Sequence, residues 1–439
     1  MSQPSPPHIK FAVLLSCAVL SVQALQAAAT TFTFSTSATG AQNWSNTANW
    51  TPATAPGTAS DNAVINRTGA SGDVTVTTPG TALVLGQFNF TAVSGSGLTL
   101  SLANNLTIGN NGSYGGSRGS INNATGDVTK MVFDLNGYTF DTVGTATYPL
   151  LMQLVPANST FTVKSTGSAG GLAIFNDFSG KVSVQDNATV WIKGPNAVSF
   201  IVNTATSTFS SASTFQVSGG VGTPYYRTQI AVNGNATGDN AFGNFVIGDA
   251  ANRATAINFT GTASSAVVVR GNFTMLQNSD LYLGYPSSLA TIKVGGNYTD
   301  NGGGMFTTYS NSATANSTIS MNGGISTERT LSINRTLNSA GGFSTSIQIG
   351  DGTNAGNVEL VNASATVGAV YTAGGARVFA NSRLDLGTST TTGDVAPLRA
   401  GNIVIDSGAT IGVTFGAHSG YALADATLGG SGNLTLNTF

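Results

Sequence analysis

Residues 278–284 (NSDLYLG) and residues 381–387 (NSRLDLG) share the pattern Asn-Ser-x-Leu-x-Leu-Gly at a separation of 103 residues. Residues 245–249 (FVIGD) and 347–351 (IQIGD) form a second related pair, 102 residues apart. Apolar residues alternate with other residues in all four segments, which is typical of a half-buried β-strand. The Asn, Ser, Gly and Asp residues beside them favour tight turns. The sequence therefore predicts a recurring unit of strand, polar turn and strand.

The same texture continues from Thr30 onward, with no helical period of 3.6 residues. Short alternating runs bounded by Gly, Asn, Asp or Ser include residues 74–76, 98–100, 106–108, 181–184, 189–192, 266–269, 403–405 and 434–436. A body of about 410 residues is too long for one β-sandwich. Repetition of short strands predicts an all-β fold, a right-handed parallel β-helix (β-solenoid). A β-propeller or tandem β-sandwiches are the alternative folds.

The composition limits the function. Only 8% of the 439 residues are charged, against about 25% in typical soluble domains. With 16 Lys and Arg and a net charge of -2, the chain is not expected to bind nucleic acid. One cysteine and two histidines leave little for thiol, metal or triad chemistry. In a solenoid, Thr, Ser and Asn can fill the outward positions and form ladders along the axis.

The first residues have the three-part layout of a secretory signal peptide. Residues 1–10 are polar, residues 11–20 (FAVLLSCAVL) are apolar, and residues 27–29 are alanines that suit an A-x-A cleavage site. The apolar run is too short to span a bilayer. We therefore expect residues 1–29 to be a signal peptide and the chain to be exported, to the extracellular space or the bacterial cell surface or outer membrane. The mature chain then has no transmembrane segment; an uncleaved anchor, or a lipoprotein signal at Cys17, is the alternative.

Residues 30–80 are expected to form an N-terminal strand and capping region. Trp44 and Trp50 are two of the three tryptophans, and they are candidates to cover the first turn, because an open end exposes strand edges and core. Exposed indoles would instead form a sugar-stacking platform. Residues 81–439 are assigned to solenoid repeats. Because residues 432–437 (GNLTLN) resemble the middle of a turn, the solenoid is expected to be incomplete at the C-terminus.

These features resemble bacterial surface proteins with autotransporter-associated β-strand repeats. The resemblance rests on the repeat texture, on Trp44 and Trp50 followed by Pro56 and Asp61, and on residues 428–436 (LGGSGNLTL). It implies an exported, passenger-like β-solenoid, often large and commonly adhesive. Proteins of this kind end in a membrane barrel or a short sorting anchor. Neither pattern follows here, so a truncated, split or released product is expected.

Polysaccharide-cleaving enzymes also use β-helices, but fold analogy is a weak argument for function. Hydrolysis requires paired carboxylates, and the candidate pairs are Asp134 with Asp141 and Asp177 with Asp186. Gly or Asn lies beside most aspartates of the chain, which favours a turn role for them. No catalytic residue is therefore assigned. We expect a non-enzymatic surface or secreted structural protein, with a polysaccharide-binding or polysaccharide-cleaving lyase or hydrolase as the alternative.

Few residues are candidates for ligand contact. Tyr225, Tyr226 and Arg227 are the densest aromatic and cationic group of the body, and a loop there would suit contact with a partner or sugar. Residues 350–357 (GDGTNAGN) lack the ligand spacing of an EF-hand loop. No cofactor or metal is expected, and weak calcium binding in a turn is the alternative. The expected partners are surface glycans or other envelope proteins.

Overall fold

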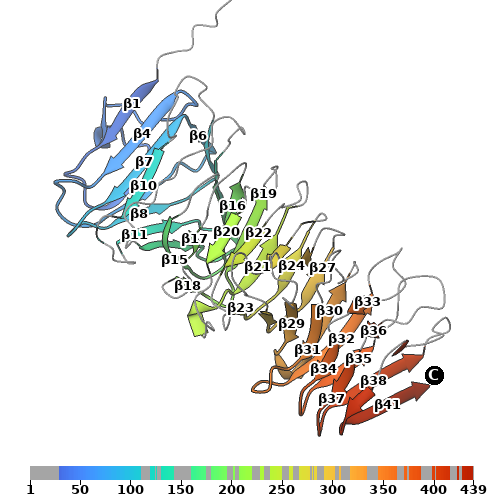
Figure 1. Ribbon diagram of the computed structural model, residues 1–439. Helices are drawn as coiled ribbons and strands as arrows, with labels where there is room; N and C mark the ends of the chain where they lie inside the picture. Colours follow the sequence, from blue (N-terminus) through green and yellow to red (C-terminus); the bar gives the residue numbers. More distant parts are fainter. Residues whose placement is uncertain are drawn as a thin grey trace, which may run out of the picture.

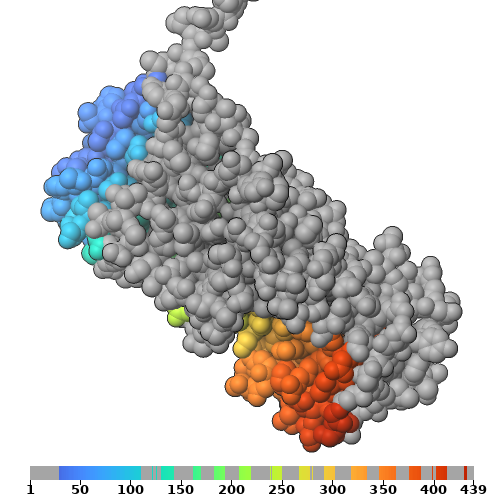
Figure 2. Space-filling view, in the orientation of Figure 1, coloured from blue at the N-terminus to red at the C-terminus, as the bar shows by residue number. Residues whose placement is uncertain are grey.

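The chain is an elongated stack of β-strands in a computed structural model (Figures 1 and 2). The structure describes residues 29–109, 119–123, 125, 130–142, 160–174, 179–194, 201–202, 207–219, 228–231, 238–249, 257–260, 266–276, 279, 281–283, 291–301, 306–307, 317–333, 345–362, 370–372, 375–386, 398–400, 402–415, 423–424 and 428–438. The described residues of the N-terminal and C-terminal parts lie at opposite ends of the stack.

One sheet of 14 parallel strands runs along most of the stack, and we call it the long sheet. Its strands are β6 (Leu83–Leu85), β9 (Leu106–Ile108), β12 (Thr139–Thr142), β14 (Gly170–Ile174), β16 (Ala188–Gly194), β19 (Thr214–Gly219), β21 (Asn244–Ile247), β24 (Phe273–Met275), β27 (Tyr298–Asp300), β30 (Gly324–Ile333), β32 (Gly356–Asn362), β35 (Arg383–Leu386), β38 (Thr410–Phe415) and β41 (Asn433–Thr438).

Two further sheets flank the N-terminal part of the long sheet. The five-stranded sheet contains β1 (Thr30–Phe34), β3 (Trp50–Thr51), β4 (Asp61–Asn66), β7 (Gln87–Ala92) and β10 (Gly119–Asn123). The eight-stranded sheet contains β2 (Gly40–Asn43), β5 (Val74–Thr77), β8 (Leu98–Ser101), β11 (Met131–Asp134), β13 (Thr160–Lys164), β15 (Ser179–Val184), β17 (Ile201–Val202) and β18 (Thr208–Phe209). Because β7, β8 and β9 follow one another into three different sheets, the turn that they form has three sides.

The same three-sided arrangement continues towards the C-terminus. The four-stranded sheet contains β20 (Thr228–Ala231), β22 (Ile257–Thr260), β25 (Leu281–Leu283) and β28 (Phe306–Thr307). The seven-stranded sheet contains β23 (Ala266–Val269), β26 (Thr291–Val294), β29 (Ser317–Met321), β31 (Thr345–Ile349), β34 (Ala376–Val378), β37 (Ile403–Ile405) and β40 (Leu428–Gly430). The three-stranded sheet contains β33 (Val370–Thr372), β36 (Leu398–Ala400) and β39 (Leu423–Ala424).

The chain is thus an all-β parallel solenoid, which confirms this fold over the propeller and the sandwiches. Two short 3₁₀ helices, η1 (Thr47–Asn49) and η2 (Gly238–Asn240), are the only helices among the described residues. The coil already begins within residues 30–80, since β1 pairs in parallel with β4, and β2 with β5. The right-handed sense of the coil stays a prediction.

Alternation along each strand places the core inside the coil. In β5 and β8 the pattern is strictly buried then half-buried, as the alternating sequence predicts. In the long sheet, Phe245, Phe273 and Tyr298 occupy successive turns and are fully buried. Their rings stack, with centroid separations of 5.6 Å and 5.2 Å and interplanar angles of 9° and 6°. Stacking of like residues therefore fills the core along the axis.

Glycine and asparagine form the corner that leads into the long sheet. The Asn272 backbone N–H donates to Asn244 Oδ1 at 2.9 Å, and the Asn297 N–H donates to Asn272 Oδ1 at 2.9 Å. The ladder ends on Thr330, whose N–H donates to Asn297 Oδ1 at 3.0 Å. An asparagine ladder, expected for stacked polar positions, thus links four successive turns.

Candidate functional site

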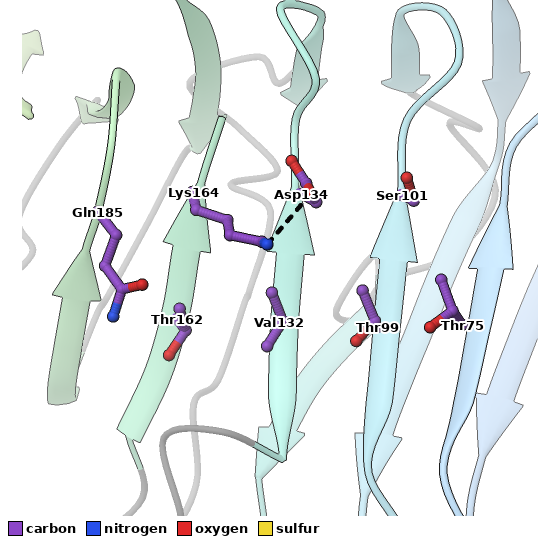
Figure 3. Close-up of a pocket in the computed structure, with 8 residues that line it drawn as sticks. All are labelled: Thr75, Thr99, Ser101, Val132, Asp134, Thr162, Lys164 and Gln185. Carbon is purple, nitrogen blue, oxygen red and sulfur yellow. Dashed lines mark ion pairs between the residues drawn. The ribbon is translucent and has the colours of Figure 1, made fainter. Parts of the chain in front are cut away.

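A polar groove lies on the outer face of the eight-stranded sheet (Figure 3). Its volume is about 450 Å³, and it is lined by Thr75, Thr99, Ser101, Val132, Asp134, Thr162, Lys164 and Gln185. These side chains come from β5, β8, β11 and β13 and from the turn after β15. The groove therefore runs across the strands, along the axis of the solenoid.

Parallel register arranges the groove side chains in rows. Thr75 pairs with Thr99, Thr99 with Val132, and Val132 with Thr162. A second row, seen beside the first in Figure 3, is built by the pairing of Ser101 with Asp134 and of Asp134 with Lys164. Residues two apart on a strand share one face of the sheet. The side chains of both rows therefore face the groove, and the residues between them on each strand face the core.

The charges in the groove neutralise each other. Lys164 Nζ lies 3.4 Å from Asp134 Oδ2. The Asp134 carboxylate also accepts hydrogen bonds from the Thr166 backbone N–H at 3.1 Å, from Thr166 Oγ1 at 2.8 Å and from the Asn136 N–H at 3.3 Å. Its side chain is only 13% exposed. A carboxylate held in this way positions Lys164 and the following turn, and it is poorly suited to act as a nucleophile or base.

Three of the eight residues that line the groove are threonines. Within the described part of the chain, the Thr75 and Thr99 hydroxyls have no protein partner. Each hydroxyl can donate one hydrogen bond and accept others, and Val132 adds an apolar side chain to the same row. The groove thus combines hydroxyls and small apolar surface, which suits binding rather than catalysis.

A second group of charges lies on the outer side of the long sheet. Glu328 and Glu359 are the two glutamates of the sequence, and they lie on the adjacent strands β30 and β32. Glu359 pairs in register with Asp385, and Glu328 is hydrogen-bonded to Asp385. The pKa of Glu328 is raised, chiefly by burial of its carboxyl group. The hydrogen bond to Asp385 and the negative charges of Asp385 and Glu359 raise it further. Arg383 Nε and Nη2 donate to Asp385 at 2.6 Å and 2.7 Å.

A third polar site is the corner at Asp351. Its Oδ1 accepts hydrogen bonds from the Thr353 and Asn354 N–H groups at 3.0 Å and 2.8 Å. Its Oδ2 accepts from Asn322 Nδ2 at 3.0 Å and from Lys293 Nζ at 3.1 Å. Burial alone would raise the pKa of Asp351, but these hydrogen bonds hold it well below its usual range. The Asp351 carboxylate therefore fixes the tight turn of residues 351–354 and ties it to Lys293 and Asn322 in preceding coils of the solenoid.

We expect Asp351→Asn to lower the free energy of unfolding by about 2 kcal/mol at pH 7, because an amide NH₂ would face the Lys293 and Asn322 donors. A lowered pKa stabilises the fold above the unfolded-state value of about 3.9 and loses that effect as pH falls below it. The difference between wild type and variant should therefore shrink at pH 3. Urea unfolding at both pH values measures it. Asp186→Asn, on an exposed turn with φ 52°, is the control and should change little at either pH.

The pocket beside this corner is closed to sugar stacking. It has a volume of about 370 Å³ and includes Arg377, Phe379 and Asp406. The Arg377 guanidinium lies 4.5 Å from the centre of the Phe379 ring and is paired with Asp406 at 3.1 Å. Because the arginine covers the ring, the aromatic face is not available to a ligand.

The predicted capping tryptophans are buried at the N-terminal end. Trp44 and Trp50 are 0% and 3% exposed, with ring centroids 4.8 Å apart. Trp44 Nε1 donates to the Pro56 carbonyl at 2.9 Å, and Trp50 Nε1 donates to the Trp44 carbonyl at 2.7 Å. An exposed sugar-stacking platform is therefore wrong. Trp50 begins β3, which pairs antiparallel with β1 at the end of the five-stranded sheet; the capping role itself stays a prediction.

The two carboxylates of the first candidate pair lie in different sheets. Asp134 lies on β11 of the eight-stranded sheet, whereas Asp141 lies on β12 of the long sheet. Asp177 lies outside the described residues, and so do Tyr225, Tyr226 and Arg227.

Neither the carboxylate group at Glu328 nor the groove was predicted from the sequence. The signal for the first was the presence of only two glutamates, 31 positions apart, in a charge-poor chain. The signal for the second was the outward threonine in the short runs at residues 74–76 and 98–100. Strand alternation predicts that these threonines point outward, but only the register shows that they form one row.

No protein-family description, curated protein or solved structure matches this chain. Among the described residues, no group of three or more His, Cys, Asp and Glu side chains is arranged to hold a metal ion. The same residues include no helix with the length and apolar character needed to cross a membrane.

Proposed function

We propose that the chain is an exported, non-enzymatic surface or secreted structural protein, a passenger-like rod that adheres to surface glycans or other envelope proteins. The observation that carries this proposal is the polar outer face of the eight-stranded sheet, where rows of hydroxyls surround a neutralised ion pair. Such a face offers many weak hydrogen bonds over an extended surface, as adhesion requires. The leader-like residues 1–29 and the resemblance to autotransporter-associated repeats support export.

The dimensions of the stack suit display away from a surface. At about 4.8 Å between neighbouring strands, the 14 strands of the long sheet extend over about 60 Å. Every inner strand is hydrogen-bonded on both edges, so the rod needs few surface charges to suppress edge-to-edge association. This accounts for a chain of 8% charged residues.

Export is tested by expressing the full chain in a Gram-negative host and determining the N-terminal residue of the protein in each cell fraction. We expect protein outside the cytoplasm to begin at Thr30. Leu15→Arg, which interrupts the apolar run of the leader, should leave the precursor in the cytoplasm. Recovery of wild-type protein only as the cytoplasmic precursor beginning at Met1 would contradict the proposal.

A polysaccharide-cleaving enzyme is the second candidate, and the carboxylate group on the long sheet favours it. Retaining and inverting glycosidases use one protonated and one ionised carboxyl group. The pKa of Glu328 is raised, as that of a general acid must be, and Arg383 donates a hydrogen bond to the neighbouring Asp385. In this case wild-type protein would release reducing ends from a polysaccharide panel that includes pectin and alginate, and Glu328→Gln would release none. We expect no release from either protein.

A further inference from the structure

We propose that the groove on the eight-stranded sheet binds a neutral, extended β-1,4-linked polysaccharide that lies along the solenoid axis. The inference rests on the proposed function, because it names the class of surface glycan that the rod contacts. It concerns the groove lined by the rows from Thr75 to Thr162 and from Ser101 to Lys164.

The spacing of the strands matches the repeat of an extended sugar chain. Neighbouring strands in the eight-stranded sheet are about 4.8 Å apart, and each sugar ring of an extended β-1,4-linked chain advances by nearly the same length. Each turn of the solenoid can therefore meet one sugar ring. The five strand positions from Thr75 to Gln185 span about 19 Å, which is long enough for a short oligosaccharide.

The side chains of the two rows match the chemistry of a sugar ring. A pyranose ring has apolar C–H faces and hydroxyls at its rim. The row of Thr75, Thr99 and Val132 presents methyl groups together with hydroxyls that have no protein partner within the described residues. The second row adds the Ser101 hydroxyl and the Lys164 ammonium, and the groove ends at the exposed Gln185 amide. The rows can therefore contact both parts of a sugar ring.

The charges of the described lining residues favour a neutral glycan. Lys164 is the one cation among the lining residues, and it is paired with Asp134. No unpaired cation among these described lining residues attracts a uronate chain, and a carboxylate of such a chain would compete with Asp134 for the Lys164 ammonium. Neutral glycans avoid both costs, since removing an ion from water without a new partner is unfavourable.

The test measures binding of cellohexaose and xylohexaose to the purified full-length chain by isothermal titration calorimetry, with polygalacturonate as the anionic comparison. Thr99→Arg places a long cation in the centre of the groove. Thr274→Arg is the matched control, because Thr274 is also a half-buried, outward threonine in the middle of a short strand, here β24 of the long sheet.

We expect saturable binding of a neutral oligosaccharide, a loss of affinity of about tenfold or more in Thr99→Arg, and unchanged affinity in Thr274→Arg. Binding of polygalacturonate alone, equal binding by Thr99→Arg and wild type, or no binding of either hexasaccharide would overturn the inference. An exported rod that binds neither neutral hexasaccharide leaves the proposed function intact. Binding by a chain that stays in the cytoplasm overturns the proposed function and not the glycan site.

Discussion

Replacing Phe273 with alanine is expected to lower the free energy of unfolding by about 3–5 kcal/mol, the largest effect of a core truncation here. Phe273 is fully buried in the long sheet. Its ring stacks on Phe245 at 5.6 Å on one side and on Tyr298 at 5.2 Å on the other. Truncation removes both ring contacts and leaves a cavity between two turns whose parallel hydrogen bonds limit their collapse. Urea unfolding followed by far-UV circular dichroism measures the change.

Phe273→Leu is the control for the size of the cavity. It keeps most of the buried volume, so we expect it to cost about 1.5 kcal/mol or less. In a solenoid each turn contacts only its neighbours, so the alanine variant should also melt the turns around β24 before the rest of the stack. Equal and small losses in both variants would show that the aromatic stack does not hold these turns together.

Replacing Gly296 with alanine is expected to cost about 3 kcal/mol, because the new methyl group meets the backbone of the preceding turn. A Cβ at this position would lie 2.5 Å from the Gly271 carbonyl oxygen and 2.5 Å from Asn272 Oδ1. Real Cβ atoms do not approach other atoms so closely, so the turn must move away and weaken the Asn272 to Asn297 ladder bond. The free energy of unfolding in urea again gives the size of the effect.

Gly80→Ala is the matched control for this prediction. Nothing lies within 4 Å of a Cβ built at Gly80, and its φ is outside the left-handed region. Alanine there should leave stability unchanged or raise it by about 0.4–1 kcal/mol, since it restricts the unfolded chain. Similar losses in both glycine variants would contradict the close approach of turns at Gly296.

The sequence repeats predicted local corners correctly but not their places in the coil. Gly248 and Gly350, at matching positions of the 102-residue repeat, both have positive φ, at 87° and 82°. Each lies against a corner serine of the next turn, Ser279 and Ser382 respectively. Yet Gly248 follows a strand of the long sheet, whereas Gly350 follows a strand of the seven-stranded sheet. The repeat therefore encodes one kind of corner that is used at two edges of the solenoid.

A shorter repeat was present but was missed. Gly-Asn followed by a large apolar residue begins at positions 243, 271, 296, 356, 401 and 432. The pair at 401 leads into β37 of the seven-stranded sheet, and the other five lead into strands of the long sheet. Irregular turn lengths hid this period. Leu172 pairs with Val190, 18 residues later, whereas Leu106 pairs with Phe140, 34 residues later.

The groove and the carboxylate group depend on register between turns, and alternation within a strand does not determine register. Thr75 lies beside Thr99, and Glu359 lies beside Asp385, on adjacent strands. Each pair is adjacent because the number of residues between its members is the length of one turn of the solenoid. Sequence patterns therefore predicted which side chains point outward. Only the structure shows which outward side chains of successive solenoid turns lie next to one another.

The core, the corner ladder and the groove all depend on parallel, in-register stacking of the solenoid turns. Disulfide formation tests it in a chain whose one cysteine, Cys17, is replaced by serine. Thr274 pairs with Thr299, and Thr299 with Ser332. Thr274→Cys with Thr299→Cys should form a disulfide, since adjacent strands are about 4.8 Å apart. Thr274→Cys with Ser332→Cys, about 9.6 Å apart, should remain reduced; the opposite result in peptide mapping by mass spectrometry would contradict the fold.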